Sequence, residues 1–431
     1  MPRYVRVLSF VLVVTALFSA GLAEAAQSAT TQPASTPPAF GVQFHATWAD
    51  YTDAERAALL DKLQAAGVQW VRIDLGWASL QEQGSASYSQ WYVDLADRAV
   101  DQARARGLKV LATLWATPSW ANGGGATNVP PQNVADYSRV ATWAGAHFRG
   151  RINAWEVWNE PNLNDFFAGS AAEYTELLRA GYAGLKAGDP NALVVLGGPS
   201  TNDTAWLKSV YDAGAKGAFD VMATHPYMGM ADAPPETPDD GTKYTLAHVA
   251  AVYELMKANG DGSKPIWFTE FGWSSHANWS DVENWNRGVT AEQQADYLVR
   301  AIEYVNANFP YVTNMFWYNE RNLASGNAQL DNYGLLNRDL SPKPAYTALH
   351  AYLSSAPAPA PAPSTTSPSA PAPTAPAPPT TTAPPTTTTT APPPTTAPAQ
   401  VPPKGRSKPQ RREAAQSARW PRPTYRLLRA E

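Results

Sequence analysis

The body of the chain alternates short β-rich runs with longer amphipathic stretches, and eight of each can be counted. Runs rich in β-branched and aromatic residues are typical of strands, whereas apolar residues spaced three and four positions apart are typical of helices. The segments TDAERAALLDKLQAAG and TAEQQADYLVRAIEYVNAN show the helical spacing. The strand-like runs cover residues 40–46, 70–77, 108–115, 152–159, 192–197, 219–225, 265–272 and 312–318.

Regular alternation of strands and helices, with no cluster of consecutive strands, predicts a parallel sheet. Eight such units within about 315 residues fit a closed barrel of ordinary size. A doubly wound open sheet is the alternative, but no glycine-rich phosphate-binding fingerprint follows the first strand-like run. We therefore expect an α/β fold, a (β/α)8 TIM barrel, as a single domain over residues 39–354.

The first 26 residues have the composition of a secretory signal peptide. Arg3 and Arg6 form a basic start, an apolar stretch follows over residues 7–22, and Ala-Glu-Ala provides a cleavage site. A retained membrane anchor is the alternative, but this stretch is shorter than the ~20 residues that span a bilayer. We expect a secreted protein with no membrane association after cleavage, and residues 27–38 as a short linker.

The C-terminal part of the chain differs in composition from the body. Residues 355–403 are almost entirely Pro, Ala, Thr and Ser, which predicts a disordered linker. Residues 404–431 form a basic tail with a net charge of +7, from 9 Lys and Arg against 2 Asp and Glu. Such a tail is either simply solvated or binds anionic cell-wall polymers in a salt-dependent way.

Charge and cysteine content limit the partners of the body. Residues 39–353 carry 22 Lys and Arg against 34 Asp and Glu, a net charge of −12. An acidic body does not favour nucleic acid as a partner. The chain has no cysteine, so neither disulfides nor thiolate metal sites hold the fold. We expect a monomer without cofactor or metal.

Two glutamates close strand-like runs that are rich in tryptophan, Glu160 in WEVWNEPN and Glu270 in WFTEFGW. Pro161 cannot donate to a sheet ladder, so it marks the end of the fourth strand. In a (β/α)8 barrel the carboxyl ends of the strands meet at one rim, where active sites lie. Acid-assisted cleavage of a glycosidic bond needs such a carboxyl pair, because one group donates a proton while the other attacks or activates water. The sequence therefore predicts a sugar-cleaving enzyme.

An Asn-Glu-Pro that closes strand four and a Glu that closes strand seven resemble the clan A retaining glycoside hydrolases. The string WEVWNEPN, together with ATPSWA after strand three, is similar to glycoside hydrolase family 39 and to the cellulase-like members of family 5. The resemblance covers about residues 40–353. Many family 39 members carry an additional β-sandwich domain, whereas here the linker follows the eighth helical pattern directly, so we expect a bare catalytic barrel.

The resemblance implies a role for each glutamate. Glu160 would be the general acid/base and Glu270 the nucleophile that forms a covalent glycosyl-enzyme, while Asn159 would contact the sugar 2-hydroxyl. Retaining enzymes hold the two carboxyl groups about 5 to 5.5 Å apart and inverting enzymes about 6.5 to 9.5 Å, which provides a geometric test.

Charged residues on the second strand are predicted to point into the barrel. Arg72 and Asp74 alternate with apolar residues, so both face inward if the others face the helices. An inward Arg is costly without a carboxylate partner. By resemblance Arg72 would hold the nucleophile side of the site; the alternative is a purely structural pair with Asp74 or Glu156.

Histidine and tyrosine at strand ends are further candidates for substrate binding. His225 and Tyr227 end the sixth strand where the clan carries a His-x-Tyr pair that orients the nucleophile and the sugar, although a core histidine is the alternative. His45 at the end of the first strand is a similar candidate. No spacing such as His-Glu-x-x-His accompanies the two histidines, which argues against a metal site.

The chain contains 16 tryptophans, and several fall at predicted strand ends. Aromatic faces cover the apolar faces of sugar rings, which makes Trp115 and Trp273 candidates for substrate binding, with a core role as the alternative. By resemblance Trp317 is the platform of strand eight, under the sugar that is cleaved.

The enzyme hypothesis has two competitors, a carbohydrate-binding pseudoenzyme that retains the barrel without turnover and a surface interaction protein displayed on a Pro/Thr-rich stalk. The presence of both glutamates and Asn159 argues against the first, and the stalk reading does not explain the glutamates. We therefore expect a secreted retaining glycoside hydrolase acting on a poly- or oligosaccharide, with hydrolysis or transglycosylation both open.

Overall fold

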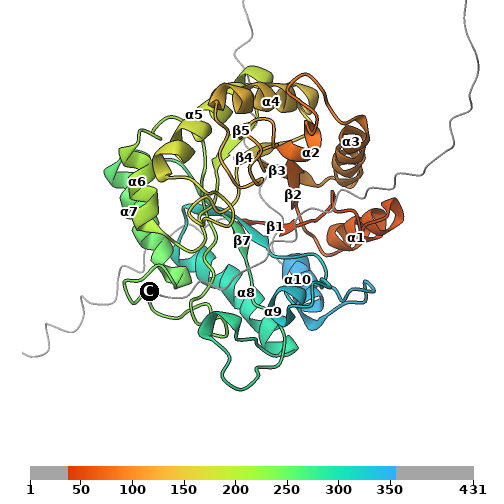
Figure 1. Cartoon of the computed structure of the whole chain (residues 1–431). Coiled ribbons are helices and arrows are strands. Elements are labelled where there is room, and N and C mark those ends of the chain that lie inside the picture. Colours follow the sequence, from red (N-terminus) through yellow and green to blue (C-terminus); the bar gives the residue numbers. More distant parts are fainter. Residues whose placement is uncertain (1–36, 356–431) are drawn as a thin grey trace, which may run out of the picture. The chain divides into compact units, whose positions relative to one another are not determined.

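Eight parallel strands form the central sheet of the computed structural model, which describes residues 37–355 (Figure 1). They are β1 (Ala39–Gln43), β2 (Trp70–Gly76), β3 (Lys109–Trp115), β4 (Ala154–Val157), β5 (Leu193–Leu196), β6 (Met222–Thr224), β7 (Ile266–Phe271) and β8 (Val312–Trp317). Neighbours pair in the order β5-β4-β3-β2-β1-β8-β7-β6, and a parallel bridge between Val195 and Val221 links β5 to the start of β6. The sheet is therefore a nearly closed barrel.

Helices surround the strands (Figure 1). Three of the long helices begin with a capping box, in which Thr52, Ser170 or Thr290 exchanges hydrogen bonds with the residue three positions on. The helices are α1 (Asp53–Ala65), α2 (Trp77–Leu80), α3 (Gln90–Ala105), α4 (Val134–His147), α5 (Ala171–Gly188), α6 (Thr204–Asp212), α7 (Val249–Ala258), α8 (Ala291–Asn308), α9 (Ala328–Asp331) and α10 (Pro344–Ser355).

Most of the apolar core lies between the barrel and its helices, and a smaller apolar cluster fills the barrel interior. Trp70, Trp267 and Phe316 form the interior cluster's aromatic part, with 5.3 Å between the two indole centroids. Arg72 follows Trp70 on the same face of β2, closer to the carboxyl end of the strand. The barrel interior is therefore apolar in one layer and polar in the next, where the strands end.

The (β/α)8 fold predicted from the alternation is confirmed, and each predicted strand overlaps an observed one. The predicted fourth strand is too long, because β4 ends at Val157 and the backbone then leaves the extended region at Trp158 (φ 77°) and Glu160 (φ 42°). The predicted signal peptide, most of the predicted linker 27–38, the Pro/Thr-rich segment from residue 356 and the basic tail lie outside the described residues. Within residues 37–355, no helix is long and apolar enough to cross a bilayer.

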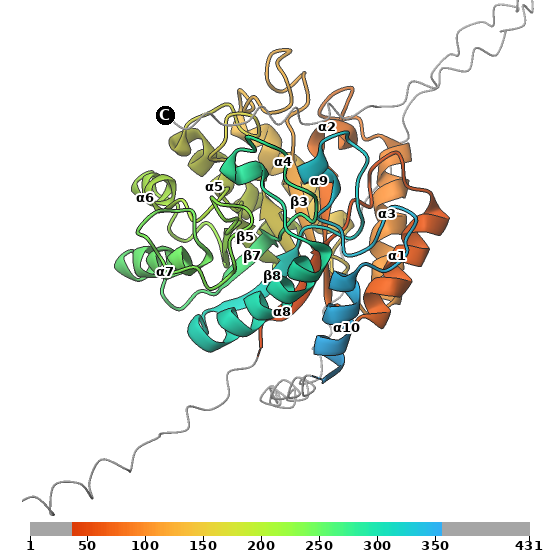
Figure 2. The ribbon, with the colours of Figure 1, turned by 90° about the horizontal axis from the view of Figure 1, so that it is seen from below.

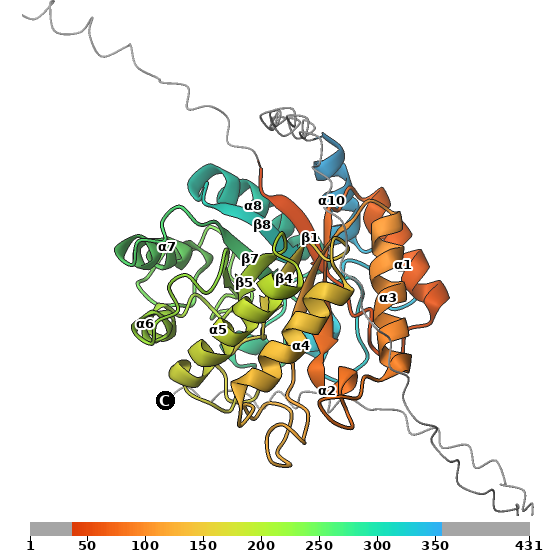
Figure 3. The same ribbon diagram turned by 90° about the horizontal axis from the view of Figure 1, so that it is seen from above.

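Figure 2 shows α8 and α10 along one side of the barrel, and Figure 3 shows α4 beside α5 on another. Close packing of α4 on α5 depends on a glycine. A Cβ atom at Gly184 of α5 would lie 2.4 Å from the carbonyl oxygen of Ser138 and 3.0 Å from the Cβ of Ala141, both on α4. The first distance is to backbone, which cannot move away as a flexible side chain can.

Gly184→Val should lower the free energy of unfolding by about 2 kcal/mol, because overpacking of a close-packed interface typically costs 1 to 3 kcal/mol. Ala183→Val is the matched control, since Ala183 is exposed on the same helix. Chemical denaturation of both variants measures the difference. Equal losses in the two variants would show that α4 and α5 can separate at little cost.

Candidate active site

The two predicted glutamates meet at the carboxyl ends of β4 and β7. Carboxylate oxygens of Glu160 and Glu270 and a ring nitrogen of His225 all lie within 4.8 Å of one another. The glutamates are 7% and 9% exposed, and His225 is fully buried. The structure therefore brings together three residues that the sequence placed on three different strands.

An irregularity in β7 directs two consecutive residues into the barrel. A regular strand alternates its side chains between two faces, yet Thr269 contacts His225 and Glu270 contacts Arg72. The pairing of β7 with β8 shifts register between Phe268 and Phe271, as a β-bulge does. This shift lets both side chains reach the site.

The backbone at the end of β4 is also irregular. Glu160 has a left-handed φ of 42°, which costs a non-glycine residue of order 1 to 3 kcal/mol. Its amide N–H donates to the carbonyl of Gly198 after β5, at 3.1 Å. The neighbouring strand thus holds Glu160 in a conformation that the segment would not adopt alone.

Arg72 on β2 connects both sides of the site. As predicted, its side chain points into the barrel, and it is 1% exposed. Its guanidinium donates hydrogen bonds to Glu270 Oε1 (2.8 Å), Glu156 Oε2 (2.8 Å), Asn159 Oδ1 (2.7 Å) and Gln43 Oε1 (2.7 Å). Both interpretations of Arg72 therefore hold. It binds Glu270, the predicted nucleophile, and it also forms the buried structural pair with Glu156.

Opposite charges around Arg72 favour the ionised forms of Arg72 and Glu156. Burial lowers the pKa of Arg72, but the carboxylates of Glu156 and Glu270 outweigh this effect, and the pKa lies above its ordinary value. Burial raises the pKa of Glu156, but the charges of Arg72 and His225 outweigh it, and the pKa lies below its ordinary value. Asp74 is not bonded to Arg72; it accepts from Gln43 Nε2 at 3.1 Å.

His225 and Tyr227 each bind one of the two glutamates. His225 Nδ1 lies 3.0 Å from Glu160 Oε1, and its Nε2 lies 3.0 Å from Thr269 Oγ1. The Tyr227 hydroxyl donates to Glu270 Oε2 at 3.0 Å. Both oxygens of Glu270 are therefore held, one by Arg72 and the other by Tyr227.

Glu270 and His225 are close to each other and buried, so each affects the pKa of the other. Burial raises the pKa of Glu270, the nearby Glu160 raises it further, and His225 and Arg72 act in the opposite direction. Burial lowers the pKa of His225, but Glu270 and Glu160 outweigh it, so this pKa lies above its ordinary value. Glu270 accepts from Arg72 and Tyr227, which favours its ionised form within the pair.

Glu160, His225 and Glu270 also have the geometry of a three-ligand metal site. Both oxygens of Glu270 are already hydrogen-bonded, and the Arg72 guanidinium lies 2.8 Å from one of them. A fixed positive charge at that distance opposes a divalent cation. The cluster therefore fits a carboxyl pair oriented by donors better than it fits a metal centre.

The structure corrects the expectation for Trp317. Its ring is fully buried, packs on Phe271 and Trp273, and donates through Nε1 to the carbonyl of Tyr333. Side chains alternate along β8, so Trp317 faces the helices while the next residue, Tyr318, follows Phe316 on the inner face. Tyr318, the first residue after β8, is half-buried, and its ring lies 5.7 Å from that of His45, so it is the aromatic residue at this strand end that faces the rim.

Trp273 is likewise in the core and not at an open surface. It is 3% exposed, donates to the carbonyl of Ala233, and packs against Tyr297, so the structure contradicts its predicted place at the substrate. Trp115 ends β3 and is half-buried, with its ring centroid 6.0 Å from that of Phe166. Of these two tryptophans, Trp115 alone keeps a partly open ring at the rim.

His45 lies near the rim but binds a different carboxylate. Its Nδ1 lies 3.0 Å from Glu320 Oε2, and Glu320 also accepts from the hydroxyl of Tyr51 in a very short hydrogen bond. Glu320 is completely buried, and its pKa is lowered by His45 although burial acts in the opposite direction. His45 thus belongs to a buried ion pair beside the site.

Tyr333, on the loop between α9 and α10, was not predicted. Its ring lies 6.0 Å from that of Tyr227 and 5.5 Å from that of Tyr318, and burial together with the charges of Glu270 and Glu160 raises its pKa. The alternation of side chains along strand eight could have predicted that Tyr318 faces the barrel interior. No local pattern indicates Tyr333, because its place depends on how a long loop folds back.

Comparisons with known proteins agree with this architecture. The chain is 29% identical over 175 residues to a β-xylosidase of Caldicellulosiruptor saccharolyticus, a match that covers 37% of this chain and 35% of the relative. It is 32% identical over 180 residues to a probable glucan 1,3-beta-glucosidase of Arthroderma benhamiae, covering 39% and 41%. The chain thus spans less than half the length of these curated relatives.

The solved structure of a family 39 glycoside hydrolase from Bacteroides cellulosilyticus has the same fold, with a TM-score of 0.61, 24% identity, and coverage of 74% of this chain and 64% of that one. The family model described as Cellulase (glycosyl hydrolase family 5) matches residues 28–323. These findings confirm the resemblance to the clan A glycoside hydrolases. Because the family model matches more than half of the sequence, the chain belongs to the cellulase family, glycosyl hydrolase family 5.

Proposed function

We propose that this protein is a secreted retaining glycoside hydrolase that cleaves β-linked poly- or oligosaccharides. One observation carries the proposal: Glu160, which follows β4, and Glu270, at the end of β7, hold carboxylate oxygens within 4.8 Å of each other in a buried polar layer. A retaining mechanism needs carboxyl groups about 5 to 5.5 Å apart, whereas the wider spacing of inverting enzymes leaves room for a water between carboxylate and sugar.

Glu270 is the proposed nucleophile. Its two oxygens accept from Arg72 and Tyr227, which orients the carboxylate and favours its ionised form. In the first step an oxygen of Glu270 bonds to the anomeric carbon while the bond from that carbon to the leaving oxygen breaks. Glu160 gives its proton to that leaving oxygen, and the product is a covalent glycosyl-enzyme.

In the second step Glu160 takes a proton from water, the water oxygen bonds to the anomeric carbon, and the bond to Glu270 breaks. His225, which binds Glu160 Oε1, positions this carboxyl for both proton transfers. Asn159 uses its Oδ1 to accept from Arg72, so its amide NH2 remains to donate to a sugar hydroxyl. Hydrogen bonds to the 2-hydroxyl strengthen as charge develops at the anomeric carbon.

The names of the relatives suggest the substrate class. One is a β-xylosidase and another a probable glucan 1,3-beta-glucosidase, which supports β-linked xylose or glucose as the first sugars to test. Secretion is supported by the composition of the first 26 residues. The alternative is a sugar-binding protein without turnover. It does not explain why Arg72 and Tyr227 both donate hydrogen bonds to Glu270.

A 2-fluoro glycoside inactivator should form a stable ester at Glu270, because the nucleophile attacks the anomeric carbon and the fluorine slows release of the sugar. Peptide mass spectrometry of the inactivated chain locates the label. Labelling at Glu160 or at another barrel carboxylate would reverse the assignment of roles.

Glu160→Ala should slow substrates with poor leaving groups roughly 10²- to 10⁴-fold, because these need the donated proton. Aryl glycosides with activated leaving groups should lose much less in the first step. Steady-state kcat/KM for the two kinds of substrate measures the contrast. Glu176→Ala, which removes an exposed carboxylate of α5, is the control. The same loss for both substrate kinds would contradict an acid role.

Tyr227→Phe should move the acidic limb of the kcat/KM profile to higher pH by roughly one pH unit. Burial already raises the pKa of Glu270, and loss of a donor to the ionised form raises it further, so the nucleophile protonates at higher pH. The pH profile of the free enzyme measures this limb. Tyr88→Phe, a change in a tyrosine stacked on Trp143, serves as the control. An unshifted limb would mean that Tyr227 does not act on the nucleophile.

A further inference from the structure

His225, Thr269 and Glu156 form a chain of hydrogen-bonded side chains behind Glu160. His225 Nδ1 lies 3.0 Å from Glu160 Oε1, and its Nε2 lies 3.0 Å from Thr269 Oγ1. Burial raises the pKa of Glu156, whereas the charges of Arg72 and His225 and a hydrogen bond from the Thr269 side chain lower it. His225, Thr269 and Glu156 are fully buried, so bulk water does not compete for these contacts.

Glu156 acts only as an acceptor, because the groups that bond to it all donate. Arg72 Nε and the Thr113 hydroxyl each donate to Oε2 at 2.8 Å, and the amide N–H of Gly198 donates to Oε1 at 3.2 Å. An ionised carboxylate accepts only, and hydrogen bonds to it are stronger than those between neutral groups. The single hydroxyl proton of Thr269 is therefore directed to Glu156.

This direction determines the tautomer of the His225 ring. A hydroxyl whose proton is directed elsewhere can only accept from Nε2, so Nε2 carries a proton. In the neutral ring, Nδ1 then has a lone pair that faces Glu160 Oε1. Two acceptors at 3.0 Å repel each other unless a proton lies between them. Either the Glu160 carboxyl group carries that proton or the ring is cationic.

The charges around His225 also favour this proton. The titratable and charged groups that face its ring are Glu156, Glu160, Glu270, Arg72 and Tyr227. Burial lowers the pKa of His225, but Glu270 and Glu160 outweigh both burial and the opposing charge of Arg72, so this pKa lies above its ordinary value. Glu270 Oε2 lies 3.8 Å from the same Nδ1. Negative charge on both glutamates therefore makes loss of the proton unfavourable.

Gly198 provides the space in which Thr269 and His225 meet. Its carbonyl accepts from the amide N–H of Glu160 at 3.1 Å, while its own N–H donates to Glu156. A Cβ at Gly198 would lie 2.7 Å from both His225 Nε2 and Thr269 Oγ1. A larger residue would have to push these two atoms apart, so their contact depends on this glycine.

We propose that Thr269 is a positioning residue, which holds the His225 ring in its Nε2–H form and so keeps an acidic proton between His225 and Glu160. The opposite tautomer would donate from Nδ1 and favour a Glu160 carboxylate with no proton for the leaving group. Once Glu160 has given its proton, the lone pair of Nδ1 faces an ionised carboxylate, which favours uptake of a proton from water in the second step. The role of Glu160 rests on the proposed function, whereas the tautomer rests on geometry alone.

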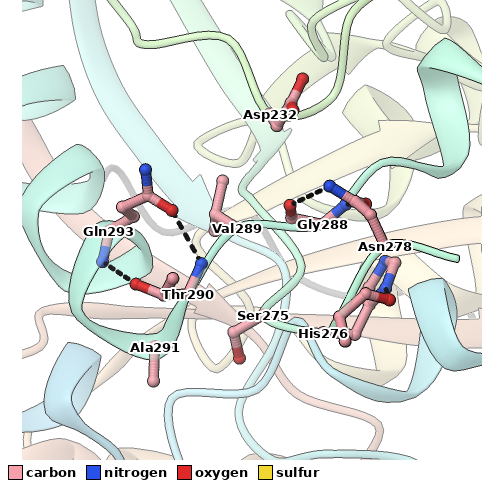
Figure 4. A pocket seen from close by; sticks show the side chains of 10 residues that line it. Asp232, Ser275, His276, Asn278, Gly288, Val289, Thr290, Ala291 and Gln293 are labelled. Atoms are coloured by element: carbon pink, nitrogen blue, oxygen red, sulfur yellow. Dashed lines mark hydrogen bonds between the residues drawn. The ribbon is translucent and has the colours of Figure 1, made fainter.

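Nitrogen NMR of the full-length chain, with isotope-labelled histidine and no substrate, measures the tautomer, because protonated and unprotonated ring nitrogens differ in chemical shift. The chain has six histidines, and the signals lost in His225→Gln belong to His225. His276, which lines a pocket between the loops after β6 and β7 (Figure 4), is the reference for the opposite form. Its Nδ1 lies 3.0 Å from the carbonyl of Ala277, which can only accept.

His225 should carry a proton on Nε2 in the wild-type chain and in Thr269→Ser, which keeps the hydroxyl. Thr269→Val has a similar shape without the hydroxyl, so the ring should change to the Nδ1–H form. Gly198→Ala separates the same two atoms with the hydroxyl in place and should act alike, which keeps the test decisive if Thr269→Val does not fold. An Nδ1–H form in the wild-type chain, or an unchanged Nε2–H form in these two variants, would overturn the proposal.

Thr269→Val should also move the basic limb of the kcat/KM profile to lower pH by roughly one pH unit, as expected for loss of one hydrogen bond. Without an acceptor at Nε2 the protonated pair of His225 and Glu160 is less stable, so it loses its proton at lower pH. The acidic limb, which reports Glu270, should stay in place. Thr269→Ser should restore the wild-type basic limb. An unmoved basic limb in Thr269→Val would contradict the positioning role.

Thr175→Val is the matched control, because Thr175 is 1% exposed on α5 and its hydroxyl donates to the backbone carbonyl of Ala171. It loses a buried hydroxyl outside the site and should leave both limbs and the His225 tautomer unchanged. The NMR measurement needs no turnover, so an Nε2–H form that depends on Thr269 in a chain that releases no sugar contradicts hydrolysis alone. Sugar release by a chain with His225 in the Nδ1–H form contradicts the positioning role alone.

Discussion

Arg72 reaches into the barrel from β2 and is bonded to carboxylates from β4 and β7, Glu156 and Glu270. Removing one partner of such a buried pair leaves an uncompensated charge, which typically costs 3 to 5 kcal/mol. The Arg72 guanidinium can keep both contacts only if β2, β4 and β7 stay in their present positions relative to one another. The same positions bring Glu270 close to Glu160. Stability and site geometry in this barrel depend on one set of contacts.

The fold could be predicted because its signal is periodic. Each strand–helix unit repeats the same apolar spacing, so errors at single positions do not change the count of eight. Strand ends carry no such repetition. The fourth strand was predicted to run through Asn159, whereas the backbone becomes left-handed at Trp158. No side chain there indicates this conformation, because tertiary contacts impose it.

Site residues could be predicted where a residue of suitable chemistry lies at a strand end. Prediction was weaker where the direction of a side chain decides whether it faces the site. Glu160, Glu270, Arg72, His225 and Tyr227 are titratable or hydrogen-bonding residues at strand ends, and the structure brings them together. For Trp317 the residue type was suggestive but the pleat points its ring toward the helices, so Tyr318 faces the rim instead. Tyr333 depends on the path of the loop between α9 and α10, and loop paths have no period to detect.

The double pairing of Arg72 bears on what happens to charge during turnover. In the proposed mechanism Glu270 loses its negative charge when it becomes an ester, and a guanidinium with no other carboxylate would then be a buried, uncompensated cation. Glu156 is completely buried, lies 2.8 Å from Arg72 and takes no part in bond making, so its charge stays constant throughout. Glu156 would thus remain the counterion of Arg72 in the proposed intermediate, which would limit the rise in energy along the reaction path.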